Sequence, residues 1–138
     1  MPARRVDADR APPSEPSLNT DTLRLKADWQ YEQHGRRQHY TIQAFLGSAL
    51  VGRGHGWFEP GGRFLLEKVE MTPRHRSKGY GSLVIEALRE KARASDCTEF
   101  VFHGVRPANR GAIRLYESLG AQGIAKPDGL MDFVIAPP

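Results

Sequence analysis

A short segment rich in glycine and basic residues offers the clearest chemistry in this sequence. Residues 76–82 read Arg-Ser-Lys-Gly-Tyr-Gly-Ser, between an apolar stretch and a helical pattern. The first N–H groups of a helix lack intrahelical partners and carry partial positive charge, and glycine lets a ligand approach the backbone. Arg76 and Lys78 add full positive charges. The segment predicts a cradle for a small anion such as a diphosphate; the alternative is a tight turn in which Gly79 and Gly81 serve only the backbone.

A second motif lies farther along the chain. Residues 105–121 read Val-Arg-Pro-Ala-Asn-Arg-Gly-Ala-Ile-Arg-Leu-Tyr-Glu-Ser-Leu-Gly-Ala. Together with Met-Thr-Pro at 71–73 and the glycine-rich segment, this motif resembles the GNAT-type N-acetyltransferases, which share V-x-P-x-x-R-x-x-G-x-G followed by V-x-x-x-N-x-x-A-x-x-L-Y-E-x-x-G-F. Met71 replaces the first valine and Ala121 the final phenylalanine. The resemblance is strong from residue 64 to about 121 and looser before it.

The resemblance implies a binding site for acetyl-CoA in a V-shaped gap between splayed fourth and fifth strands. The pyrophosphate would lie on the glycine-rich loop, and strand backbone would pair with the pantetheine as an added strand does. The N–H of Met71 would also polarise the thioester carbonyl. The residues that the resemblance assigns to the cofactor are Val69, Met71, Arg76, Lys78, Gly79, Tyr80, Gly81, Ser82 and Asn109.

Tyr116 matches the family's frequent general acid, which protonates the departing CoA thiolate. A phenol with an ordinary pKa near 10 stays protonated at neutral pH and can donate. The alternative is a core tyrosine beside Ala112 and Leu119.

A proton acceptor is also required, because an ammonium group has no lone pair for attack. Strand alternation predicts that Glu67 shares a face with Leu65, Val69 and Met71. Family members with a base on this strand place it four or six residues before the Met71 position, and of Glu67 and Leu65 only Glu67 can accept a proton. Alternatively, Glu67 pairs with a basic side chain. A bulge in the strand would reverse the alternation that turns Glu70 away.

Length and composition bound the class of protein. The 138 residues, 39% of them hydrophobic, suit one domain. No apolar run approaches the ~20 residues of a membrane span, and no apolar core follows the basic residues near the N-terminus, so we expect neither a span nor a secretory signal. The single cysteine, Cys97, makes a reduced cytoplasmic compartment the expectation. The five histidines share no ligand spacing, so we expect no metal.

The net charge of +4 is concentrated at one place. Residues 72–78 contain Arg74, Arg76 and Lys78 and no acid, whereas the charges of residues 1–20 cancel. Such a focused charge suits a small polyanion better than a long nucleic-acid track, so we expect no nucleic-acid partner. The rivals are a solvated basic loop and a nucleic-acid-binding protein.

The elements that position these residues follow from the hydrophobic period. Alternation or apolar character predicts strands over 23–29, 40–46, 49–58 and 64–71, then a strand over 99–105 and a last one over 130–135. Helical spacing predicts helices over 79–94 and from Asn109 to Gly120. The order ββββ-α-β-α-β indicates an α/β fold with a mixed sheet and a right-handed crossover between the fourth and fifth strands.

Residues 1–20 hold four of the ten prolines and few large apolar residues, which predicts a flexible leader before a domain over 21–138. The family usually places one or two helices between its first two strands, but only residues 30–38 separate them here. We therefore expect an acceptor side that is open or completed by a second subunit in a homodimer. The implied reaction is acetyl transfer to a primary amine of a small molecule or peptide by direct attack in a ternary complex. The alternative is a CoA-binding sensor or regulatory module without turnover.

Overall fold

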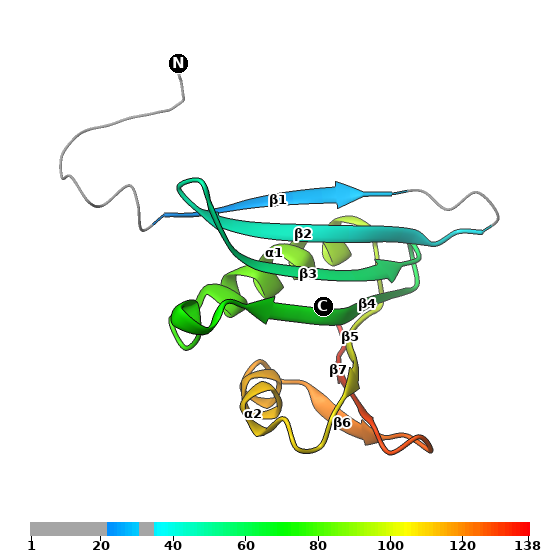
Figure 1. Cartoon of the computed structure of the whole chain (residues 1–138). Coiled ribbons are helices and arrows are strands. Elements are labelled where there is room, and N and C mark those ends of the chain that lie inside the picture. Colours follow the sequence, from blue (N-terminus) through cyan, green and yellow to red (C-terminus); the bar gives the residue numbers. More distant parts are fainter. Residues whose placement is uncertain (1–21, 31–34) are drawn as a thin grey trace.

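A seven-stranded sheet and two helices make up the fold (Figure 1). This is a computed structural model that describes residues 22–30 and 35–138, and the expected leader over 1–20 lies outside this part. The strands lie in the order β1-β2-β3-β4-β5-β7-β6. Along the chain the elements are β1 (Leu23–Trp29), β2 (Gln38–Leu46), β3 (Ala49–Phe58), β4 (Arg63–Met71), the 3-10 turn η2 (Pro73–His75), α1 (Tyr80–Ala94), β5 (Glu99–Val105), α2 (Arg110–Ser118), β6 (Gln122–Ala125) and β7 (Met131–Ile135).

The expected α/β class and element order are confirmed, with one addition. β1 to β4 form the predicted antiparallel meander, and β4 and β5 are parallel across the α1 crossover. The prediction of a single strand after α2 was incomplete, because Gln122–Ala125 forms β6 and pairs with β7 at the sheet edge. All four residues of β6 are exposed, so apolar alternation could not reveal it.

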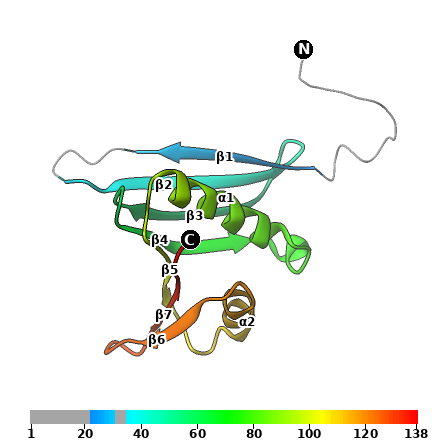
Figure 2. The same ribbon diagram turned by 180° about the vertical axis from the view of Figure 1, so that it is seen from behind.

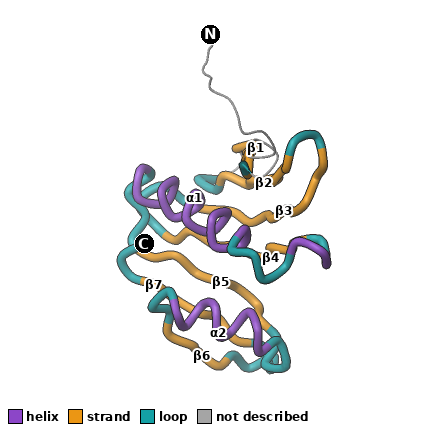
Figure 3. The backbone as a smooth tube through the Cα atoms, turned by 90° about the vertical axis from the view of Figure 1, so that its left-hand side faces the viewer, coloured by secondary structure: helices purple, strands orange, loops and turns teal. Residues whose placement is uncertain are grey.

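Both helices contribute to one core on one face of the sheet. α1 buries side chains at helical spacing, namely Val84, Ile85, Leu88 and Ala92. Seen from behind, α1 crosses the β2–β4 region (Figure 2), and Figure 3 shows α1 beside the β1–β4 half and α2 beside the β5–β7 half. A row of aromatic rings runs through this core from β2 to β5, with centroid separations of 5.1 Å for Tyr40–Phe64, 5.2 Å for Phe64–Phe100 and 5.1 Å for Phe100–Phe102.

β4 and β5 are paired over only part of their length. Their parallel pairs run from Arg63 with Glu99 to Leu66 with Phe102. Beyond Leu66 and Phe102 the two strands separate, which confirms the splay that was expected between the fourth and fifth strands.

A bulge in β4 coincides with the start of this separation. His55 lies opposite Lys68, but its neighbour Gly56 lies opposite Leu66, so Glu67 is an extra residue in β4.

The bulge changes which residues face the helices. Leu66, Val69 and Met71 pack with the core, whereas Glu67 is exposed. The predicted alternation, which placed Leu65, Glu67, Val69 and Met71 on one face, therefore holds only up to the bulge.

Gly56 leaves room for this arrangement. A Cβ atom there would collide with the Leu65 carbonyl and the Tyr40 hydroxyl. That hydroxyl donates a hydrogen bond of 2.8 Å to the Leu65 carbonyl, which satisfies a buried acceptor at the bulge.

The opposite face of the sheet carries polar and charged side chains, and no helix of the described chain covers it. We call it the helix-free face and define it by Thr41, Gln43, Arg53, His55 and Lys68, from β2, β3 and β4.

Candidate active site

A groove of about 1030 Å³ follows the gap between β4 and β5 and reaches the start of α1. It brings together side chains from β4, the loop after η2, α1, β5 and α2. The predicted site residues that line it are Glu67, Val69, Met71, Arg76, Gly79, Gly81, Ser82, Asn109 and Tyr116. Lys78 and Tyr80 belong to the same loop and helix start but do not line the groove.

The loop before α1 turns its backbone toward the groove. Ser77 and Gly79 have positive φ angles of 60° and 83°, a conformation that glycine adopts at little cost and serine does not. Gly79 is the N-cap of α1 and has no side chain with which to cap it. Leu83 is the first residue whose N–H returns to the Gly79 carbonyl, at 3.2 Å, so the N–H groups of Tyr80, Gly81 and Ser82 have no intrahelical partner.

The space in front of this helix start is open. A Cβ atom built on Gly81 meets no atom within 4 Å, and the first turn of α1 contains no acidic residue. Unpaired amides, the positive end of a helix and open space together fit a bound diphosphate.

Arg76 is fixed at the end of β4. Its Nε donates a hydrogen bond of 3.2 Å to the Met71 carbonyl, and it forms no ion pair with an acid in the part of the chain that the structure describes. The terminal nitrogens of its guanidinium are therefore available to an anion in the groove.

The outer half of β4 offers its backbone to the gap. The Thr72 N–H bonds to the Val51 carbonyl at 2.8 Å. Backbone groups alternate in direction along an antiparallel strand, so those of Val69 and Met71 point away from β3 and toward the separated β5. A ligand in extended conformation could pair with them there.

Tyr116 on α2 lines the groove near the last paired residues of the sheet. Its ring stacks on Phe102 with centroids 3.9 Å apart, and Phe133 lies on another side at 6.0 Å. Tyr116 is 8% exposed, and burial raises the pKa of its phenol, so the hydroxyl stays protonated at neutral pH. Tyr116 therefore packs in the core, which was the alternative interpretation, and also lines the groove.

Glu67 stands at the bulge and contacts a basic group. Its Oε1 lies 3.5 Å from Nδ1 of His55 on the helix-free face. Both side chains are more than one-third exposed, so this contact leaves the carboxylate accessible.

Asn109 performs a structural task beside the groove. Its side-chain oxygen accepts a hydrogen bond of 3.3 Å from the Ala112 N–H and caps α2, as predicted.

The groove also contains a residue that the sequence did not single out, His103 on β5. Its Nδ1 lies 3.1 Å from Oδ1 of Asp132 on β7. The two residues are far apart in sequence and belong to no motif, so only the register of β5 and β7 brings them together.

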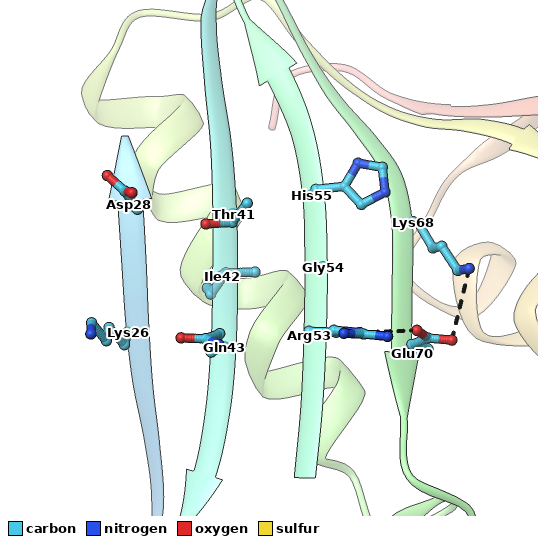
Figure 4. A pocket seen from close by; sticks show the side chains of 10 residues that line it. All are labelled: Lys26, Asp28, Thr41, Ile42, Gln43, Arg53, Gly54, His55, Lys68 and Glu70. Atoms are coloured by element: carbon cyan, nitrogen blue, oxygen red, sulfur yellow. Dashed lines mark hydrogen bonds and ion pairs between the residues drawn. The ribbon is translucent and has the colours of Figure 1, made fainter. Parts of the chain in front are cut away.

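A second, smaller depression of about 560 Å³ lies over the helix-free face (Figure 4). Its charges are largely paired, because Glu70 contacts Arg53 at 3.2 Å and Lys68 at 3.9 Å. Lys68 and Glu70 line both this depression and the groove, so the two spaces adjoin along β4.

Three further observations concern other kinds of site or location. Cys97 is buried, directs its thiol toward the Glu59 carbonyl at 3.5 Å and does not line the groove. Over residues 22–30 and 35–138, no three histidine, cysteine or acidic side chains cluster as metal ligands. Neither described helix has the length and apolar character needed to traverse a bilayer.

Known proteins share both sequence and fold with this chain. Residues 4–121 match the Acetyltransferase (GNAT) family. Thialysine N-epsilon-acetyltransferase of Mus musculus is 32% identical over 91 residues, which cover 63% of this chain and 53% of the relative, and that of Sus scrofa gives the same values. The chain thus spans about half the length of the curated relatives it matches.

Solved structures share the fold at low sequence identity. PaiA N-acetyltransferase from Thermoplasma acidophilum, in complex with coenzyme A, superposes with a TM-score of 0.64 at 14% identity, covering 70% of this chain and 59% of that one. The Bacillus subtilis acetyltransferase in complex with CoA gives a TM-score of 0.61 at 14% identity, covering 83% and 100%. Because the family match takes in most of the sequence, the chain belongs to the GNAT family of acetyltransferases.

Proposed function

We propose that this protein transfers an acetyl group from acetyl-CoA to a primary amine by direct attack in a ternary complex. One observation carries the proposal: a single groove joins the unpaired amides at the start of α1, backbone groups of β4 that point away from β3 and a protonated tyrosine. Acetyl-CoA, when bound, supplies the activated thioester. No acyl-enzyme is required, and Cys97 lies outside the groove.

The anion cradle would hold the pyrophosphate at the open end of the groove. Arg76 and Lys78 would contribute charge, Gly79 would leave the backbone accessible, and the amides of Tyr80, Gly81 and Ser82, which have no intrahelical partner, would contact the phosphates. Asn109 would contact the cofactor arm from the start of α2.

The backbone of Val69 and Met71 would pair with the pantetheine and direct it along the gap. The Met71 N–H would stabilise the negative charge that develops on the thioester oxygen.

Two side chains would move protons. Tyr116 donates one to the departing thiolate, which its raised pKa permits because the hydroxyl remains protonated. Glu67, at the exposed side of the bulge, accepts one from the ammonium group directly or through a water molecule.

The acceptor is proposed to be a small-molecule or peptide amine. The names of the curated relatives make thialysine the first acceptor to test. The groove adjoins the depression on the helix-free face, so that face is the proposed route for the amine.

The test is an assay of CoA thiol release with a panel of thialysine, lysine, spermidine and short peptides. We expect at least one amine to raise thiol release above the rate without acceptor, together with a mass increase of one acetyl group on that amine. If CoA binds but no acceptor raises thiol release, the result would instead support the CoA-binding sensor. If calorimetry detects no CoA binding, both the acetyltransferase and the sensor hypotheses would be wrong.

A further inference from the structure

Two polar side chains stand where the gap between β4 and β5 opens, one on each strand. Leu66 and Phe102 form the last parallel pair, so Glu67 and His103 are the first residues beyond it. Both line the groove. Because Leu66 and Phe102 belong to the core under the helices, the residues that follow them turn toward the helix-free face.

His103 is held by a carboxylate on the neighbouring strand. Its Nδ1 is buried, lies at an ion-pair distance of 3.1 Å from Oδ1 of Asp132 and makes no hydrogen bond of good geometry with any described residue. The side chain as a whole is 35% exposed and lines the groove. Because Nδ1 is buried beside Asp132 while the side chain lines the groove, Nε2 is the ring nitrogen left to meet a ligand there.

Asp132 is itself fixed. Its Oδ1 accepts a hydrogen bond of 3.0 Å from the Gly104 N–H and lies 3.6 Å from Nζ of Lys126. Burial alone would raise the pKa of this carboxyl, but the Gly104 N–H, His103 and Lys126 outweigh it and lower the pKa, so Asp132 stays ionised. A fixed anion beside Nδ1 favours the neutral tautomer that is protonated at this nitrogen, and that tautomer leaves Nε2 with a free lone pair.

We propose that His103, oriented by Asp132, is a second proton acceptor for the amine, acting from β5 opposite Glu67 on β4. The inference rests on the proposed acetyl transfer. His103 is the catalytic residue in this pair and Asp132 is a positioning residue.

The proton transfer can be written in full. An N–H bond of the ammonium group breaks and its proton passes to Nε2 of His103, which leaves a lone pair on nitrogen. The lone pair forms the C–N bond, the C–S bond breaks, and sulfur takes the proton of the Tyr116 hydroxyl. Nitrogen loses its second proton to solvent, solvent restores the proton of Tyr116, and His103 returns its proton to solvent, so one proton is released per amide formed.

Asp132 on β7 contacts the imidazole and Lys126, after β6, contacts Asp132. The charged residues that line the same groove are Glu67, Lys68, Glu70, Arg76 and Arg106. Lys126 partly offsets the charge of Asp132, and Lys68 partly offsets that of Glu67. These neighbours set the pH dependence together, so variants are compared over a full pH profile.

The test measures kcat/KM of the full chain for thialysine, or for the best amine of the panel, in His103→Gln and Asp132→Asn. We expect about a tenfold to hundredfold loss at pH 7 for His103→Gln and a smaller loss for Asp132→Asn, with KM for acetyl-CoA unchanged. The loss of kcat/KM in His103→Gln should be smaller above pH 9, because more of the amine is then already deprotonated and needs no base. A purely structural role would give the same fractional loss at every pH. His39→Gln, a histidine of β2 outside the groove, is the matched control.

A second readout needs no turnover. Long-range proton–nitrogen NMR of the histidine rings should show His103 protonated at Nδ1 in its neutral form, with this preference weakened in Asp132→Asn. Protonation at Nε2, or unchanged kcat/KM in His103→Gln beside an active wild type, would overturn the inference and leave the proposed function standing. An inactive wild type with every amine would instead remove the proposed function and this inference with it.

Discussion

Arg76 and Tyr116 lie at different places along the same groove, as the contacts of their side chains show. Arg76 bonds to Met71, where β4 ends, and Tyr116 stacks on Phe102, where the β4–β5 pairing ends. A molecule lying between them would have its anionic part at Arg76 and its reacting part at Tyr116. Each residue can therefore be tested by a change that removes one chemical group and keeps the packing.

Tyr116→Phe removes the hydroxyl and keeps the ring stacked on Phe102. We expect kcat to fall about 100-fold or more, since proton donation by a placed side chain contributes ~10² to 10⁴. Because burial raises the pKa of Tyr116, the hydroxyl ionises only above its ordinary range, so the wild type should lose activity from this group only at strongly alkaline pH and the variant should lack that limb. Steady-state kinetics over pH, with CoA affinity and thermal unfolding unchanged, checks this; an unaltered kcat would reduce Tyr116 to a core residue.

Arg76→Ala removes a guanidinium from the open end of the groove. We expect about tenfold weaker CoA binding, the size of one charge-assisted contact, with no change in thermal unfolding because the side chain is exposed. Arg74→Ala is the matched control, since Arg74 is a nearby exposed basic residue that does not line the groove. Calorimetric titration with CoA measures both, and equal affinities for the two variants would remove Arg76 from the site.

At the scale of elements, the start of α1 and the bulge in β4 create the site. The helix start supplies unpaired amides, and the bulge brings Glu67 out of the strand while leaving Val69 and Met71 with the core. The start of α1 contains glycine. A substitution there can separate the effect of the helix start on folding stability from its expected effect on ligand binding.

Gly81→Ala should move stability and ligand binding in opposite directions. Alanine is the better helix former by up to ~1 kcal/mol, and its Cβ would enter open space, so we expect unfolding stability to stay equal or rise. The same methyl group would occupy the place of the bound phosphate and weaken CoA binding. Gly111→Ala, at the second position of α2 and equally uncrowded, is the stability control. Chemical denaturation and calorimetry report the two quantities, and unimpaired CoA binding would contradict the cradle.

The sequence predicted the elements that carry strong local signals. Alternation in β2, helical spacing in α1 and the cap at Asn109 are local, and the structure has all three. The bulge at Glu67 could not be predicted, because it depends on how β3 registers against β4, on Gly56 and on the bond from Tyr40 to Leu65. The contact of His103 with Asp132 was equally hidden, since it joins two strands through tertiary pairing.

At the scale of the molecule, α1 lies beside the β1–β4 half of the sheet and α2 beside the β5–β7 half (Figure 3). Residues from both halves line the groove, so a ligand there would contact both. Binding to the folded state alone stabilises it by mass action, and the basic loop makes the effect sensitive to salt.

CoA at about 100 times its dissociation constant should therefore stabilise the folded chain by about 2.7 kcal/mol. We expect a higher midpoint of thermal unfolding with CoA, a smaller shift at high ionic strength, and no comparable shift with an oligonucleotide of equal phosphate concentration. Scanning calorimetry measures all three. A larger shift with the oligonucleotide would favour the nucleic-acid-binding rival.

The short junction between β4 and β5 also has a mechanical consequence. Four residue pairs, ending at Leu66 and Phe102, join the two strands. Beyond these pairs β4 and β5 are no longer paired with each other. A ligand bound between the separated strands would contact both of them and restrict their motion relative to each other. Amide hydrogens on both sides of the gap would then exchange more slowly and together. The ligand would in effect complete the sheet where β4 and β5 do not pair.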